Sequence, residues 1–157
     1  MSFARHLLVD GANILHAWPE LRAVLKRDRD AARSQLVQRL AAIHDVEQAR
    51  VTIVFDGRGT EIVVEQPFEE STFAVVFTPS SLTADDVIEQ LVGKAADAAS
   101  CLVATDDRAE RETVTAAGAT ALSADELAAW LRKVEARQTG ALAARRTENS
   151  RKWKERS

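Results

Sequence analysis

Apolar segments of strand length recur along this chain, and three of them end directly in aspartate. They read Leu-Leu-Val-Asp10, Thr-Ile-Val-Phe-Asp56 and Leu-Val-Ala-Thr-Asp106-Asp107. Longer stretches, in which apolar residues recur with helical spacing, separate these segments. The alternation predicts the α/β class, with a mainly parallel sheet covered by helices.

Periodicity and capping signals place the individual elements. Strands are expected at residues 6–10, 51–57, 73–77, 101–105 and 119–122, while residues 62–65 form either a short strand or an irregular loop. Helices are expected at residues 29–48, 84–95, 108–117 and from 124 onward, with a short helical turn after residue 10 that stops near Trp18-Pro19. Two capping boxes are predicted, Thr83 with Asp86 and Ser123 with Glu126.

Charge divides the chain into an acidic body and a basic end. Its 157 residues, 46% of them hydrophobic, suffice for one core and leave no length for a second folded unit. Residues 1–131 carry 12 Lys+Arg against 21 Asp+Glu, whereas residues 132–157 carry 9 against 3. We therefore predict a domain at residues 1–137 and a basic C-terminal tail at 138–157, helical or disordered, which either contacts a polyanion or is a solvated helix end.

Several classes of protein are excluded. Apolar runs fall far short of the roughly 20 residues that cross a bilayer, and no signal peptide precedes the first strand, so we expect a cytoplasmic protein without membrane contact. The single Cys101 and three scattered histidines argue against a disulfide, thiol redox chemistry or structural zinc.

The strand-end aspartates are the informative residues. In an open parallel sheet the carboxyl ends of the strands share one edge, where such folds place their binding crevice. A helix that starts just after another strand adds carboxylates to the same edge. The candidate set is Asp10, Asp56, Asp106 and Asp107 at strand ends, with Asp85 and Asp86 at the helix start.

Gathered carboxylates require a compensating charge, because like charges raise each other's pKa. Oxygen ligands without nearby histidine or thiolate favour Mg²⁺ or Mn²⁺, and magnesium pairs carboxylates with phosphate oxygens. The set therefore predicts hydrolysis of a phosphate ester by metal-activated water. In the alternative interpretation each aspartate merely caps a helix or complements its dipole.

Other polar residues have secondary roles. Asn13 lies one helical turn after Asp10 and either orients water or a phosphate oxygen or forms a turn, while Glu89 either joins the acidic face or is a solvated side chain. Arg58 and Arg108 either meet phosphates or offset the negative charge of the neighbouring aspartates, and Lys152 and Lys154 are the candidate phosphate contacts in the tail.

Together these motifs resemble the YacP-like branch of the NYN domains, which belong to the PIN-like nucleases. The resemblance covers about residues 5–137 in order. It is carried by Val9-Asp10-Gly11-Ala12-Asn13-Ile14, Ala17-Trp18-Pro19, Val54-Phe55-Asp56, Phe77-Thr78, Thr83-Ala84-Asp85-Asp86-Val87-Ile88-Glu89 and Val103-Ala104-Thr105-Asp106-Asp107. It departs from the family at Ala12, where an aromatic residue is common.

The resemblance implies a three-layer α/β/α fold and a metal-dependent endoribonuclease that leaves 5′-phosphate and 3′-hydroxyl ends. Asp10, Asp56, Asp85 and Asp107 match the family's acidic positions and are expected to hold Mg²⁺ or Mn²⁺; Asn13 matches a polar companion, and Asp86 and Asp106 rank second. RNA is the expected partner, and the ribosome a further one. Two alternatives stay open: a non-cleaving RNA- or ribosome-binding adaptor, and a phosphatase of small phosphate esters. Asp10-Gly11-Ala12 lacks the Asp-x-Asp of haloacid-dehalogenase enzymes, which counts against the phosphatase.

Overall fold

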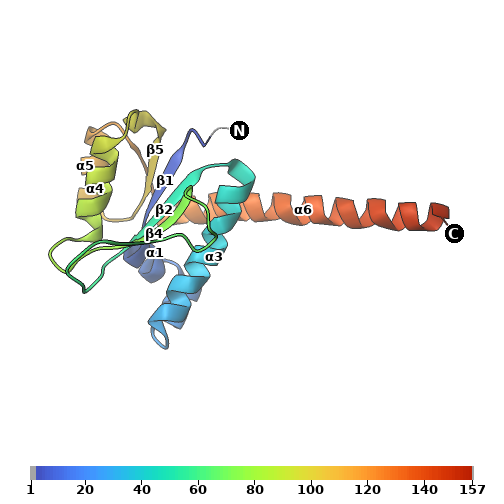
Figure 1. The fold of residues 1–157 in the computed structure, drawn as a ribbon, viewed down its shortest axis with the longest axis horizontal. Helices are drawn as coiled ribbons and strands as arrows, with labels where there is room; N and C mark the ends of the chain where they lie inside the picture. The colour runs from blue at the N-terminus through green and yellow to red at the C-terminus, as the bar shows by residue number, and fades with distance from the viewer. Residues whose placement is uncertain (1–2, 157) are drawn as a thin grey trace.

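A mainly parallel six-stranded sheet forms the centre of the molecule (Figure 1). The computed structural model describes residues 3–156, and the side chains of residues 3–140. The strands are β1 His6–Asp10, β2 Arg50–Phe55, β3 Val63–Glu65, β4 Phe73–Phe77, β5 Cys101–Ala104 and β6 Thr120–Leu122, in the spatial order β3-β4-β2-β1-β5-β6. Only β3 pairs antiparallel, on β4 at the sheet edge. The α/β class and the parallel sheet are confirmed.

Helices cover both faces of the sheet. They are α1 Gly11–Ala17, α2 Pro19–Leu25, α3 Arg29–Glu47, α4 Ala84–Lys94, α5 Arg108–Ala116 and α6 Ala124–Arg156, with a 3₁₀ turn at Ala98–Ser100. Successive side chains of a strand point to opposite faces. Leu7 and Val9 accordingly join the core beneath α1, α2, α3 and α6, whereas Leu8 joins the core beneath α4 and α5. The result is a three-layer α/β/α fold.

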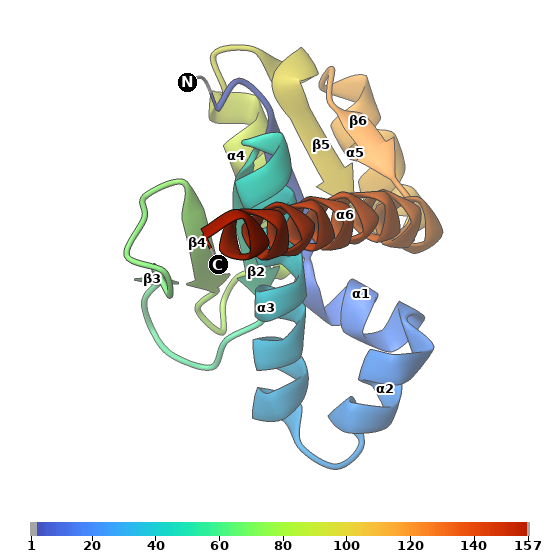
Figure 2. The same ribbon diagram turned by 90° about the vertical axis from the view of Figure 1, so that its right-hand side faces the viewer.

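Most predicted elements are present, and α2 is the main difference. Pro19 was expected to mark the end of a helical segment, and it is also the first residue of α2, a position where its missing N–H costs nothing. The buried Trp18 separates α1 from α2, and its indole Nε1–H donates to the carbonyl of Ala124 at 2.9 Å. Figure 2 shows α1 and α2 lying beside α3. Residues 63–65, the ambiguous segment, form the edge strand β3.

The last helix begins at the predicted capping box and extends away from the sheet (Figure 1). Ser123 accepts from the N–H of Glu126, whose carboxylate accepts from the N–H of Ser123, each at 3.0 Å. The α6 helix continues to Arg156 without a break at residue 137, so the domain boundary stays a prediction. Within the described residues no helix has the length and apolarity needed to cross a bilayer.

Candidate metal centre

Three carboxyl groups from separate elements meet at the carboxyl edge of the sheet. They belong to Asp10 at the end of β1, Asp85 in the first turn of α4 and Glu110 in the first turn of α5. One oxygen of each lies within 4.8 Å of the others. Asp10 and Glu110 are buried and Asp85 is half-buried, so this three-carboxyl group lies below the surface at the carboxyl edge of the sheet.

Local structure fixes Asp10 and Asp85. Asp10 ends the central strand and caps α1, its Oδ1 accepting the N–H of Asn13 at 3.3 Å. Asp85 lies between the two members of the predicted capping box on α4, which is present: Thr83 Oγ1 accepts from the N–H of Asp86, and the Asp86 carboxylate accepts from the N–H of Thr83. Two helix starts therefore point acidic side chains toward one place.

The Glu110 side chain can join the three-carboxyl group because it does not close the capping box that its position in α5 would allow. It stands three residues after the helix cap Asp107, the spacing that produces closed capping boxes at Thr83 and Ser123. The Glu110 N–H donates to Asp107 Oδ1 at 3.0 Å, but the N–H of Asp107 donates to Thr105 Oγ1 instead of to Glu110. Both Glu110 side-chain oxygens are buried and have no hydrogen-bond partner among the described residues. The carboxyl group is thus free to bind something else.

The electrostatics of this group favour a bound cation. Burial, followed by the neighbouring carboxyls of Asp10 and Asp85, raises the pKa of Glu110 to about 10. Burial also raises the pKa of Asp10 to about 6, although the N–H of Asn13 opposes the shift. A buried carboxylate without a partner is unfavourable, and a divalent ion would compensate all three groups at once. An all-oxygen donor set with orphaned buried oxygens fits Mg²⁺ or Mn²⁺.

Asp56 and Asn13 border the same site. With Asp10 and Asp85 they line an open cavity of about 570 Å³ at the strand ends. Asp56 is exposed, and its Oδ1 accepts the N–H of Ala84 at 3.0 Å, the first N–H of α4. Asn13 Oδ1 accepts the N–H of Asp106 at 2.8 Å, which ties the loop after β5 to α1.

Three of the four remaining acidic candidates accept backbone N–H groups at helix starts, and the fourth, Glu89, lies in the middle of α4. Asp106 accepts the first N–H of α6, from Ala124, at 2.8 Å, and Asp107 caps α5. Asp86 closes its capping box, and Glu89 is exposed on α4. Among the described residues the three-carboxyl group includes none of these four, nor Asp56. Metal roles for Asp56 and Asp107 stay predictions.

The predicted cations are distributed around the site. Arg58 lines a cavity beside Asp56, whereas Arg108 is exposed and pairs with Glu112 at 3.1 Å. The side chains of Lys152 and Lys154 lie outside the part of the chain whose side chains are described.

Comparison with known proteins identifies the family. A family model for the YacP-like NYN domain matches residues 7–157. The chain belongs to the YacP-like NYN domain family. It is 35% identical over 130 residues to the YacP protein of Bacillus subtilis strain 168, covering 82% of this chain and 74% of that protein.

Solved structures agree with this assignment. The crystal structure of Rae1 (YacP) from Bacillus subtilis superimposes with a TM-score of 0.74 at 32% identity, covering 92% of this chain and 83% of that one. A tryptophan-to-leucine mutant of the same protein gives a TM-score of 0.71 at 32% identity, over 85% and 78% of the two chains. The NYN family is of the PIN-like nuclease type, which is the class that the resemblance of the sequence motifs implied.

Proposed function

We propose that this protein is a metal-dependent endoribonuclease that uses Mg²⁺ or Mn²⁺ held by Asp10, Asp85 and Glu110. The observation that carries the proposal is the three-carboxyl group, in which one oxygen of each residue lies within 4.8 Å of the others. Both buried oxygens of Glu110 have no hydrogen-bond partner in the part of the chain whose side chains are described. Membership of the NYN family supports RNA as the substrate.

The residues of the site divide the work. A bound ion supplies an activated water and neutralises charge on the departing oxygen. Asp10 and Glu110 hold their carboxylates away from bulk water, which strengthens their attraction for a cation. Asn13 lines the cavity above them and presents a polar side chain to substrate, while Asp56 sets the start of α4 and borders the same space.

The basic C-terminal residues would add affinity for RNA. The body is acidic, so phosphate contacts at residues 138–157 would offset its repulsion of the backbone, and a ribonucleoprotein such as the ribosome is a candidate docking partner. Deleting residues 138–157 should weaken RNA binding more than it slows cleavage of bound RNA. Unchanged affinity would remove the tail from this proposal.

Cleavage assays on structured and unstructured RNA test the activity. Purified protein is incubated with Mn²⁺, Mg²⁺ or EDTA, and Asp10→Asn and Glu110→Gln are compared with Glu112→Gln. Glu112 lies on the same helix, is exposed and is not a member of the three-carboxyl group, so this control makes the same chemical change outside the site. We expect metal-dependent cleavage in the wild type and Glu112→Gln, and its loss in the other two variants. Equal cleavage by Glu110→Gln would refute the assignment, and RNA binding without cleavage under any metal would favour the adaptor.

A further inference from the structure

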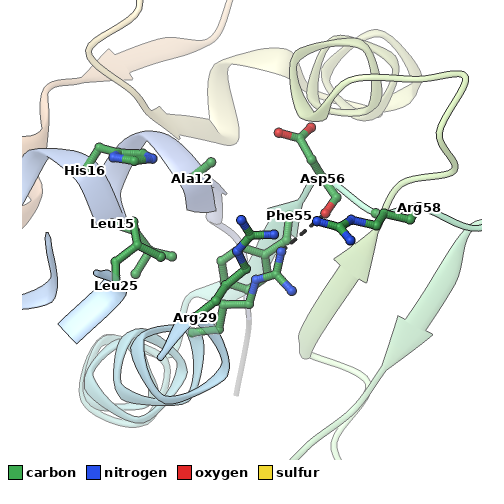
Figure 3. A pocket seen from close by; sticks show the side chains of 10 residues that line it. Ala12, Leu15, His16, Leu25, Arg29, Phe55, Asp56 and Arg58 are labelled. Atoms are coloured by element: carbon green, nitrogen blue, oxygen red, sulfur yellow. Dashed lines mark hydrogen bonds between the residues drawn. The ribbon is translucent and has the colours of Figure 1, made fainter. Parts of the chain in front are cut away.

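Three arginines line a second cavity, which lies next to the cavity above the three-carboxyl group. Arg29 and Arg33 come from the first two turns of α3, and Arg58 follows β2. The cavity measures about 350 Å³, large enough for part of a nucleotide. Figure 3 shows the side chains of Arg29 and Arg58 extending into the space below Asp56. We call this cavity the arginine pocket.

Arg33 is held rigidly at the wall of the pocket. Its guanidinium carbon lies 5.0 Å from the ring centroid of Phe55 and 5.4 Å from that of Phe77, positions that permit cation–π attraction. Nη2 donates to the main-chain carbonyl of Asp56 at 3.4 Å. A half-buried guanidinium fixed in this way loses little entropy when it binds an anion.

Positive charge in the pocket is not neutralised by ion pairs. Among the described residues none of the three arginines forms an ion pair within 4.0 Å. Burial, and then the charge of Arg29, lower the pKa of Arg33, while Asp30 and Asp56 act in the opposite direction. The Asp56 carboxylate points away from the guanidinium groups and accepts the N–H of Ala84 (Figure 3). An anionic ligand would complete the pocket.

The arginine pocket adjoins the cavity above the carboxyl group. The two cavities share Ala12, His16, Asp56 and Gly57 in their walls. We propose that the arginine pocket binds a backbone phosphate of the RNA nucleotide next to the cleaved linkage. This inference rests on the proposed nuclease function, because that function defines which phosphate is cleaved and which is its neighbour. The affinity of the arginine pocket for RNA can nevertheless be measured without cleavage.

Binding without metal tests the pocket directly. Fluorescence anisotropy of a labelled single-stranded RNA is measured in EDTA for the double variant Arg29→Gln/Arg58→Gln and for the control Arg22→Gln/Arg27→Gln. All four arginines are exposed, and the control removes the same charge from residues that do not line the pocket. We expect the pocket variant to lose about tenfold or more in affinity relative to the control, since charge-assisted hydrogen bonds to phosphate are lost. The slope of log Kd against log salt should fall by about 0.7, the value for one phosphate contact on a single strand. An abasic oligonucleotide of equal length should show the same loss, because the pocket contacts phosphate.

Specific outcomes would overturn the inference. They are equal affinity of the two double variants, no measurable RNA binding by the wild type, or a loss confined to base-bearing RNA. In Mn²⁺ we expect the pocket variant to raise KM with kcat within about twofold of the control, and a fall in kcat alone would contradict a binding role. If Glu110→Gln abolishes cleavage while both double variants bind RNA alike, the pocket fails and the nuclease stands. If no RNA is cleaved but the affinity difference holds, the nuclease fails and the arginine pocket remains an RNA-backbone site.

Discussion

Replacing Glu110 with glutamine should stabilise the metal-free protein and remove its response to metal. The residue is 1% exposed, and its carboxyl oxygens have no hydrogen-bond partner among the described residues. With a pKa of about 10, its carboxyl group is protonated at pH 7 when no cation is bound. Glutamine keeps the shape, cannot ionise, and offers an amide N–H to the neighbouring carboxyls of Asp10 and Asp85. The usual destabilising effect of a buried substitution is therefore reversed here.

The magnitude follows from the pKa. Glu110 shifts from 4.5 to about 10, so at pH 7 the fold must bind a proton that the unfolded chain has released. At about 1.4 kcal/mol for each pH unit above 4.5, this costs about 3–4 kcal/mol at pH 7 and about 5–6 kcal/mol at pH 8.5. Between pH 4.5 and about pH 10 the folded state binds more protons than the unfolded state, so the free energy of unfolding falls as pH rises through this range. Asp10, with a pKa of about 6, adds to the slope only below pH 6.

Urea unfolding in EDTA between pH 6 and pH 9 measures this slope. We expect wild type to lose about 1.4 kcal/mol per pH unit from this residue, and Glu110→Gln to lose none of that amount. Saturating Mn²⁺ at about 100 times its Kd should add about 2.7 kcal/mol to the wild type and much less to the variant. Glu112→Gln should follow the wild type throughout. The reasoning is refuted if the variant is no more stable than wild type in EDTA at pH 8 and has the same slope.

Three further substitutions test how the site is built. A Cβ on Gly57 would lie 2.1 Å from the carbonyl oxygen of Thr78, so Gly57→Ala should lower the free energy of unfolding by about 1–3 kcal/mol in urea titrations. Trp18→Phe removes the indole N–H that donates to the carbonyl of Ala124 at the start of α6 and should cost about 0.5–1.5 kcal/mol by the same measurement. Asp107→Ser keeps a helix cap but removes a carboxylate; the metal role predicted for Asp107 requires Mn²⁺ affinity to fall about tenfold in calorimetric titration at nearly unchanged stability.

The sequence predicted the sheet because its signals are local. Strand-length runs of apolar, often β-branched residues indicate strands that are buried on both faces. The four-residue capping boxes indicate helix starts independently of tertiary contacts. The short α2 helix was missed for a related reason. A proline after a helix is compatible either with a loop or with the first turn of another helix. The structure has the second arrangement, in which the buried Trp18 lies between α1 and α2.

Part of the carboxyl group could not be predicted, because Glu110 looks like a surface residue in its own segment. It stands among charged neighbours in Arg108-Ala-Glu-Arg-Glu and at the position of an ordinary capping-box acid. Glu110 is buried because it lies on the side of α5 that faces the sheet, and which side does so is set by tertiary packing. The one local signal is Val114, four residues later on the same helix face and 1% exposed, which indicates that this face is turned inward.

The strand-end aspartates Asp10, Asp56 and Asp107 bond to backbone N–H groups at helix starts, as the capping interpretation expected, and these bonds also position the three-carboxyl group. Asp56 accepts the first N–H of α4, the residue before Asp85, and Asp107 accepts the N–H of Glu110 itself. Each aspartate thereby fixes the helix start that carries a member of the three-carboxyl group, while Asp10 caps α1 and belongs to that group directly. Because the caps are bonded to the backbone of the turns that carry Asp85 and Glu110, the three carboxyl groups are held near one another in the metal-free protein. A divalent ion bound by all three carboxyls would displace the proton that Glu110 holds in the metal-free protein, so its binding should tighten as pH rises.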